Sequence, residues 1–197
     1  MSAGARTLQV RLVVSAVDRG LELNTKLVVP RRDDEALSHV VLRVLAFCLF
    51  CGEHGRPGEL RLAPGPADRD GPDLWSHDLA GRPVEWIICG APDLEELRYV
   101  LQHQRQAQIR ILLGSDEERE RFLAGIHAFR RPLERLRSVD VRQVDARLLE
   151  ALARRDDERQ RWLVTVVEGH VYVEQDGQGA DGEVAPVPMP SEEALRR

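Results

Sequence analysis

The sequence is short of lysine, aromatic residues and cysteine. Lys26 is its single lysine, aromatic residues make up 5%, and there are 3 cysteines in 197 residues. Three cysteines are too few for the disulfide frameworks on which small secreted domains depend. With 33 acidic residues against 28 basic ones and a net charge of -5, the composition gives no sign of a general affinity for phosphate backbones.

Long apolar segments are also lacking. No apolar run reaches the roughly 18 residues of a membrane-spanning helix, and no basic stretch leads into an apolar segment and a small-residue cleavage site. We therefore expect a cytoplasmic protein with reduced thiols and no membrane association. Cys48 and Cys51 have C-x-x-C spacing, but Cys89 supplies no second pair, so we interpret both as small core residues rather than zinc ligands.

The length favours one domain that can bury a core without disulfides or bound metal. We expect a single α/β domain over residues 1–175. The remaining residues, 176–197, carry repeated glycine, proline and acidic residues, and this composition predicts a flexible tail.

The first part of the chain predicts a hairpin and a helix. Alternating β-branched residues indicate strands at 8–17 and 21–29, joined by the turn Asp18-Arg19-Gly20. Residues 33–50 open with acids and then carry apolar residues at helical spacing, which predicts a well-buried helix. The Gly- and Pro-rich span 52–82 predicts an exposed loop with one short strand near 59–62, and such a loop is a reasonable place for a partner contact.

The second part alternates between strands and helices, which indicates parallel strands joined by helical crossovers. The final strand pair turns at Glu168-Gly169, and the helix at 115–129 begins with Ser115 as cap and Glu118 at capping-box spacing. The expected elements are strands at 84–90, 108–114 and 138–144, helices at 92–106, 115–129 and 145–155, and a hairpin at 161–175.

Two short motifs bear on function. Pro72-Asp73, followed by an aromatic residue about a dozen residues before a strand, is the outline of a PD-(D/E)XK nuclease motif. The basic cluster at 129–137 is interrupted by Pro132 and Glu134, so it is more typical of a solvated connection than of a nucleic-acid groove.

Taken together, several segments resemble the YaeQ family in order and spacing, over nearly the whole chain. The most specific is W-I-x-x-G-x-P-D, within WIICGAPDLEELR, followed by VLRVLAF; the others are the N-terminal hairpin, GPDLW and RWLVTVVEGHVYVE. That family is similar to PD-(D/E)XK restriction-endonuclease-like proteins. The resemblance therefore implies an α/β fold with a central mixed sheet flanked by helices, and with N-terminal and C-terminal β-hairpins.

The resemblance also implies where a metal-dependent site would lie. An acid on the first long helix, two acids on the W-I strand and a base on the next helix correspond here to Ser38, Val84, Ile88 and Arg98. Carboxylates bind Mg²⁺, which polarises the phosphate and activates water. Their replacement therefore removes the ligands of the metal. We therefore expect a degenerate catalytic site and no cofactor.

Asp73 and Glu85 are the residual acidic candidates. Alternation places Val84, Trp86 and Ile88 on one apolar face of their strand and Glu85 on the opposite face. A bulge at Pro83-Val84 would be needed to turn Glu85 inward. With that bulge, the alternative function is an atypical nuclease that binds Mg²⁺ or Mn²⁺ through Asp73 and Glu85.

The function that we expect is that of a catalytically inactive nuclease-fold protein. It would act as a binding or regulatory module, and the negative net charge favours a protein partner over nucleic acid. A third hypothesis is a nucleic-acid-binding pseudonuclease. It requires the arginines of the second half to share one surface, namely Arg98, Arg105 and Arg110 with Arg130 or Arg131.

Overall fold

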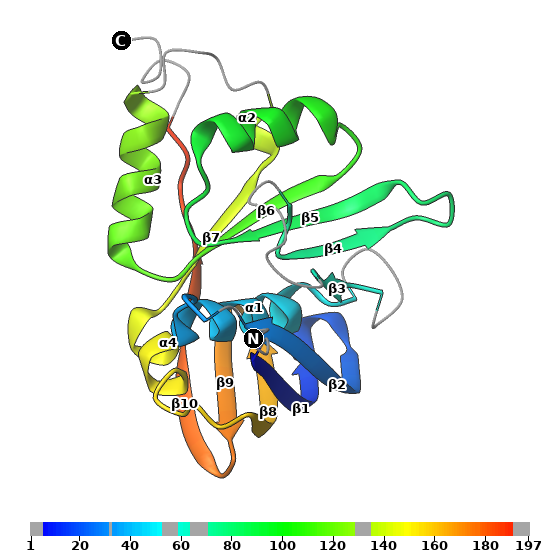
Figure 1. The fold of residues 1–197 in the computed structure, drawn as a ribbon, viewed down its shortest axis with the longest axis vertical. Helices are drawn as coiled ribbons and strands as arrows, with labels where there is room; N and C mark the ends of the chain where they lie inside the picture. Colours follow the sequence, from blue (N-terminus) through cyan, green and yellow to red (C-terminus); the bar gives the residue numbers. More distant parts are fainter. Residues whose placement is uncertain (1–5, 32, 53–58, 64–70, 129–134, 191–197) are drawn as a thin grey trace, which may run out of the picture.

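The computed structural model describes residues 6–31, 33–52, 59–63, 71–128 and 135–190, which form a mixed α/β fold (Figure 1). Its strands make one ten-stranded sheet in the order β2-β1-β8-β9-β10-β7-β6-β5-β4-β3. The strands are β1 (Arg6–Ala16), β2 (Leu21–Arg31), β3 (Arg61–Leu62), β4 (Leu74–His77), β5 (Pro83–Cys89), β6 (Gln108–Leu113), β7 (Asp140–Val144), β8 (Arg159–Val167), β9 (His170–Gln175) and β10 (Gln178–Pro186). The helices are α1 (Leu37–Phe50), α2 (Leu94–His103), α3 (Asp116–Ala128) and α4 (Ala146–Leu152).

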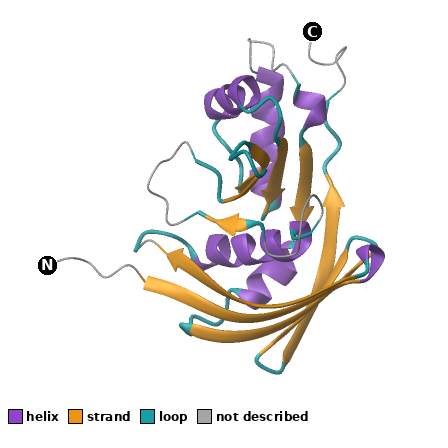
Figure 2. Ribbon diagram, turned by 90° about the vertical axis from the view of Figure 1, so that its right-hand side faces the viewer, coloured by secondary structure: helices purple, strands orange, loops and turns teal. Residues whose placement is uncertain are grey.

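The sheet has two halves that hold different helices. β5, β6 and β7 run parallel to one another, and α2 and α3 cover one face of this half. The other half, from β2 to β10, curves around α1 and α4, which lie on its concave side (Figure 2). Because every residue of α1 from Val40 to Phe50 is buried, this helix lies inside the molecule rather than on its surface.

Most of the expected elements are confirmed. The N-terminal hairpin is β1–β2, the closing hairpin β8–β9 turns at Glu168 and Gly169, and both of these turn residues have positive φ. Cys48 and Cys51 are fully buried core residues, and burial raises the pKa of the Cys48 thiol. Among the described residues, no helix combines the length and the apolar character that a membrane span requires.

The predicted flexible tail at 176–197 is wrong for its first part. β10 occupies Gln178–Pro186 and joins the two halves of the sheet, because it pairs with β9 on one side and β7 on the other. Its glycines suggested a loose segment, yet Gly182 lies where α4 packs directly on the strand. Residues 191–197 lie outside the described residues.

The predicted loop at 52–82 is wrong in one respect. The short strand expected near 59–62 is present as β3, but β4 also lies within this span and pairs with both β3 and β5. β4 has only four residues, between a Pro-Asp pair and a glycine turn. Its alternation of apolar and polar residues is too short to be recognised as a strand. Residues 53–58 and 64–70 lie outside the described part of the chain.

The close approach of α4 to β10 makes Gly182 a sensitive position. A Cβ atom at Gly182 would lie 2.9 Å from the Cβ atoms of both Asp145 and Leu148, whereas a Cβ atom at Gly179 would meet nothing within 4 Å. We expect Gly182→Ala to lower the free energy of unfolding by about 1–3 kcal/mol, as overpacking does. Urea denaturation measures the change, with Gly179→Ala on the same strand as the matched control; equal effects of the two substitutions would contradict the packing argument.

Candidate functional site

A pocket of about 390 Å³ opens beside the carboxyl ends of the parallel strands. Its walls come from the first turn of α1, the first turn of α3 and the body of α4, and Gly114 at the end of β6 lies between them. In open α/β sheets, ligands bind outside the carboxyl ends of the strands. The polar side chains of the lining are Ser38, His39, Ser115, Asp116, Glu117, Glu118 and Glu150.

His39 lies against two carboxylates. Its Nε2 is 3.4 Å from Asp73 Oδ1 and 3.7 Å from Glu35 Oε1. Burial alone lowers the pKa of His39, but the hydrogen bond and negative charge of Asp73, with the charge of Glu35, outweigh burial and raise it above 6.5. His39 therefore carries a positive charge over a wider range of pH than a solvated histidine.

Arg43 continues the same row of side chains one turn further along α1. It is buried, its guanidinium lies 2.8 Å from Glu35 Oε1, and it also donates a hydrogen bond to the carbonyl of Pro30. Glu35, His39 and Arg43 are spaced four residues apart, so they occupy one side of the helix and its entry. The carboxylate of Glu35 is thus shared between a permanent cation and a titratable one.

Asp73 is fixed by the backbone of β5. Its Oδ2 accepts a hydrogen bond of 2.7 Å from the N–H of Cys89, and its own N–H donates to the carbonyl of Ile87 at 2.9 Å. Burial raises the pKa of the Cys89 thiol, and the charge of Asp73 raises it further. Cys89 therefore remains a protonated thiol, which is a poor nucleophile and a poor metal ligand.

Glu118 occupies the space between two glycines at the strand ends. Its Oε2 accepts a hydrogen bond of 2.8 Å from the N–H of Gly114, and its own N–H donates to Ser115 Oγ at 3.1 Å. The predicted Ser115 cap is confirmed. Gly90 has φ of 85°, and a Cβ atom there would lie 3.4 Å from Glu118 Oε1, so glycine suits this position for two reasons.

Glu85 lies in a second, buried cluster further back along β5. It is 3% exposed, accepts a hydrogen bond from Ser76 Oγ at 3.1 Å and lies 3.8 Å from the guanidinium of Arg110. Arg110 in turn lies 3.2 Å from Asp140 and 4.7 Å above the ring of Phe50. The negative charge of Glu85 is therefore balanced by an arginine of the neighbouring strand.

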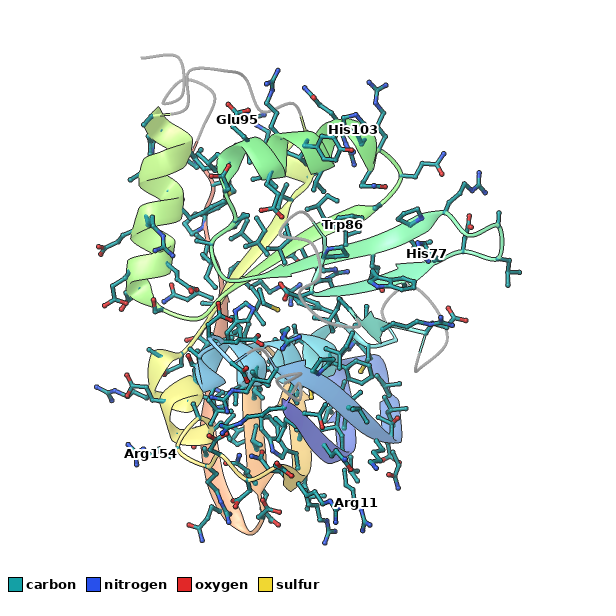
Figure 3. The ribbon with its side chains drawn as sticks, in the orientation of Figure 1. Arg11, His77, Trp86, Glu95, His103 and Arg154 are labelled. Atoms are coloured by element: carbon teal, nitrogen blue, oxygen red, sulfur yellow. The ribbon has the colours of Figure 1, made fainter. Side chains whose placement is uncertain are left out.

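The predicted faces of β5 are confirmed, but the expectation that Glu85 needs a bulge to face the interior is wrong. Trp86 lies between β5 and α2 (Figure 3), with Ile88 in the same core, whereas Glu85 faces α1 together with Ile87 and Cys89. Helices cover both faces of this central strand, so both faces are interior and Glu85 is inward without any change of face. The pairing of β5 with β4 is irregular at the expected place. His77 is opposite Pro83 and Ser76 is opposite Glu85, so Val84 has no opposite residue on β4.

The other positions that the resemblance implied are divided between the two sides of β5. Ser38 lines the pocket on the α1 side, whereas Ile88 packs in the core beneath α2 and α3. Arg98 on α2 is partly exposed and lies 3.6 Å from Glu95. Within the described residues, no group of three or more His, Cys, Asp or Glu side chains is arranged to hold a metal ion.

The arginine surface required by the nucleic-acid hypothesis does not form as expected. Arg110 is 3% exposed and points into the core, so it shares no surface with Arg98 or with Arg105, whose Nε–H donates to the carbonyl of Gln102. Arg130 and Arg131 lie outside the described residues.

Sequence reasoning did not single out Glu35, His39 and Arg43 at and beside the pocket, and it identified Glu118 only as part of a helix cap. A signal for three of them was present, since Glu35, His39 and Arg43 recur every fourth residue at the start of a helix that is otherwise apolar. A repeated charge at helical spacing on a buried helix requires internal partners. Nothing in the sequence indicated that Asp73 would be one of them.

Comparison with known proteins places the chain beside one family. The family model described as YaeQ protein matches residues 1–184. The crystal structure of the YaeQ protein from Xanthomonas axonopodis pv. citri is similar with a TM-score of 0.79 and 24% identity, over 94% of this chain and 99% of that one. The YaeQ protein from Pseudomonas syringae gives 0.77 and 23%, over 96% and 99%. These structures share the fold, and a search of curated proteins gives no match.

The Glu85–Arg110 pair gives a test of whether Glu85 is structural. Arg110→Met would leave the buried carboxylate of Glu85 without its nearby cation, and we expect the free energy of unfolding to fall by about 3–5 kcal/mol. The double variant Arg110→Met/Glu85→Gln should recover part of this loss, as measured by urea denaturation. The control is Arg82→Met, which removes an exposed pair with Asp78 and should cost at most about 1 kcal/mol. An Arg110→Met loss no larger than the control would contradict the structural role.

The raised pKa of His39 predicts a pH-dependent contribution to stability. Protonated His39 is stabilised by Asp73 and Glu35 in the folded protein, so its contribution is complete below the unfolded pKa and disappears as pH rises through the higher folded pKa. We expect His39→Gln to destabilise the protein more near pH 5.5 than near pH 8.5. Urea denaturation at both pH values measures this, and Ser38→Ala in the same pocket should show no such difference. A His39→Gln effect that is constant with pH would show that the carboxylates do not hold the proton.

Proposed function

This chain belongs to the YaeQ family, and we propose that it is a binding or regulatory protein that works through contact with another protein rather than by hydrolysing nucleic acid. The observation that carries the proposal is that Asp73 and Glu85, the acids that the sequence offered as metal ligands, are each engaged by groups of the protein itself. A carboxylate whose oxygens already have protein partners binds a metal ion more weakly. The superfamily origin, a restriction-endonuclease-like fold with a degenerate site, is part of the same proposal.

The surroundings of Asp73 favour a fixed structural carboxylate. To bind Mg²⁺ with both oxygens, Asp73 would have to release the N–H of Cys89, which would leave a part-buried backbone donor unpaired. Its other oxygen faces His39, whose raised pKa favours the protonated ring, and a positive ring repels a divalent cation. Both effects lower the affinity of Asp73 for a metal ion.

Glu85 is held in a similar way. Arg110 supplies a positive charge within 3.8 Å, and the carboxylate is buried beneath α1 with only 3% of its surface exposed. Mg²⁺ keeps several of its water ligands and needs near-octahedral space around it. A buried site that already contains a guanidinium does not provide that space.

The same strand supports a nuclease-type origin. Pro72-Asp73 precedes β4 and Glu85 follows on β5, in the order in which the PD-(D/E)XK motif places its acids. If Glu85 is the second acid of the motif, the lysine position two residues later is Ile87, whereas the family resemblance placed the base at Arg98. Ile87 is 0% exposed and packs against α1, and Arg98 lies 3.6 Å from Glu95, so neither position supplies a lysine.

The pocket beside His39 is the proposed point of contact. Its rim carries Asp116, Glu117 and Glu150, and backbone and Ser115 hydrogen bonds lower the pKa of Glu117, so that it stays ionised. An acidic rim repels phosphate and attracts cations. The partner that fits is therefore a protein that offers a basic or hydrogen-bond-donating side chain.

The proposal predicts that divalent cations do not bind at these acids. In titration calorimetry with Mg²⁺ and with Mn²⁺, we expect no saturable heat that depends on Asp73 or Glu85, because both carboxylates are engaged. Asp73→Ala and Glu85→Gln are compared with wild type, and Glu174→Gln on the exposed face of β9 is the matched control. Saturable binding that is kept in Glu174→Gln but lost in Asp73→Ala or Glu85→Gln would overturn the proposal and revive the atypical nuclease.

The contact itself is tested with a variant that fills the pocket. Ser38→Arg places a long cation at the rim, where it would occupy the space proposed for a partner's basic side chain. A protein that copurifies with wild type and with Glu174→Gln, but not with Ser38→Arg, identifies the partner. Equal capture by all three would show that the pocket is not the contact.

A further inference from the structure

β2 is the end strand of the described sheet, and its outer edge has no neighbouring strand within the part of the chain that the structure describes. It is 11 residues long, from Leu21 to Arg31, and it pairs with β1 in unbroken antiparallel register. A long regular edge strand exposes backbone N–H and C=O groups that can pair with another chain. Proteins usually cover or interrupt such an edge.

The register determines which residues of β2 offer these groups. The N–H of Gln9 donates to the carbonyl of Glu158 beside β8, so odd-numbered residues of β1 turn their backbone groups away from β2. Their even-numbered partners on β2 therefore direct N–H and C=O outward. Pro30, which has no N–H, is one of these even-numbered residues, as expected of proline on an edge.

The same even-numbered residues carry the exposed side chains of the edge. Glu22, Asn24, Lys26 and Val28 all lie on the outer, convex face, and Val28 is 50% exposed. On the concave face, Leu21 and Leu23 are only partly buried, although they pack against the core. The edge thus combines unpaired backbone, one acid, one base and incompletely covered apolar groups.

A row of like charges ends at this edge. Lys26 is directly opposite Arg11 on β1, and Arg11 is directly opposite Arg161 on β8. Arg11 points away from the helices on the outer side of the sheet (Figure 3). Directly opposed like charges destabilise a sheet, and among the described residues no carboxylate forms an ion pair with these three side chains. At the edge of the sheet beside Lys26, no acidic side chain of the described residues continues the row.

We infer that β2 pairs edge to edge with β2 of a second copy of this chain, antiparallel about a two-fold axis at Asn24. In that register Asn24 is opposite its own copy, and Glu22 is opposite Lys26 of the second copy, twice by symmetry. In this register, each residue that directs its N–H and C=O outward is opposite a residue of the second copy that does the same. The backbone hydrogen bonds between the two strands can therefore form. Glu22 of the second copy then supplies the negative charge that the row lacks.

Charge favours this register over its neighbours. Axes at Leu23 and at Thr25 also match the backbone groups, but they would place Glu22 opposite Asn24 or Val28 and form no pair of opposite charges. Moving the axis to Lys26 also matches the backbone groups, but it would place two lysines opposite each other and oppose Glu22 with Pro30, which has no N–H to donate. In the register at Asn24, the half-covered Leu21 and Leu23 meet Leu27 and Thr25 of the second copy on the concave face. Only the register at Asn24 therefore pairs Glu22 with Lys26, and Lys26 and Pro30 disfavour the register at Lys26.

The test is a charge exchange on the full-length chain. We expect wild type to be a dimer by light scattering coupled to gel filtration, and Glu22→Lys and Lys26→Glu each to raise the dissociation constant about tenfold or more, because each turns two attractive pairs into repulsive ones. The double variant Glu22→Lys/Lys26→Glu restores opposite charges and should restore the dimer. Glu174→Lys, on the same outer face but away from the edge, should leave the dimer unchanged.

The single lysine gives an independent measurement. A carbodiimide joins an amine to a carboxylate in contact with it, so in wild type it should link Lys26 of one copy to Glu22 of another, as identified by peptide mass spectrometry. A monomeric wild type with no such link overturns the proposal. A dimer that survives both single charge reversals, or that the double variant fails to restore, also overturns it. The outcome is independent of the proposed function, because neither Glu22 nor Lys26 lines the pocket.

Discussion

The arrangement of the pocket depends on the need to neutralise Arg43. This arginine is buried in a helix that is surrounded by apolar side chains, and an unpaired buried charge costs several kcal/mol. Glu35 meets it from the entry to α1, and the carbonyl of Pro30 meets it from the end of β2. The cation therefore ties together the first hairpin, the start of α1 and, through Glu35, the environment of His39.

From His39 the same constraint extends to the central sheet. Asp73 faces the imidazole with one oxygen and holds the backbone of β5 with the other, so a single carboxylate connects α1, β4 and β5. Further along β5, the buried acid Glu85 is likewise balanced by a protein group, Arg110 of the adjacent strand. In both places a carboxylate holds separate elements of the protein together.

How much of this was predictable differs between the fold and the site. Hydrophobic periodicity and turn residues located β1, β2, α1 and the alternating elements from β5 to α4, because each has a strong local pattern. β10 was missed because the glycine that suits its packing against α4 also suits a loose tail, and only the tertiary contact at Gly182 distinguishes the two. The site was less predictable, since Asp73, His39 and Glu118 come from separate elements and meet only after the strands have paired.

The distribution of charge connects the interior to the surface. Inside, Asp73 lies against His39, Glu35 against Arg43, and Glu85 against Arg110. On the outside of the described part of the chain, charges of one sign gather at the rim of the pocket, where Asp116 is paired with Arg119, and in the row that ends at Lys26. These two places differ in sign and lie on different elements, so each would attract a different kind of group. Under the proposed function, these surface charges rather than the interior ones are the groups that a partner protein would meet.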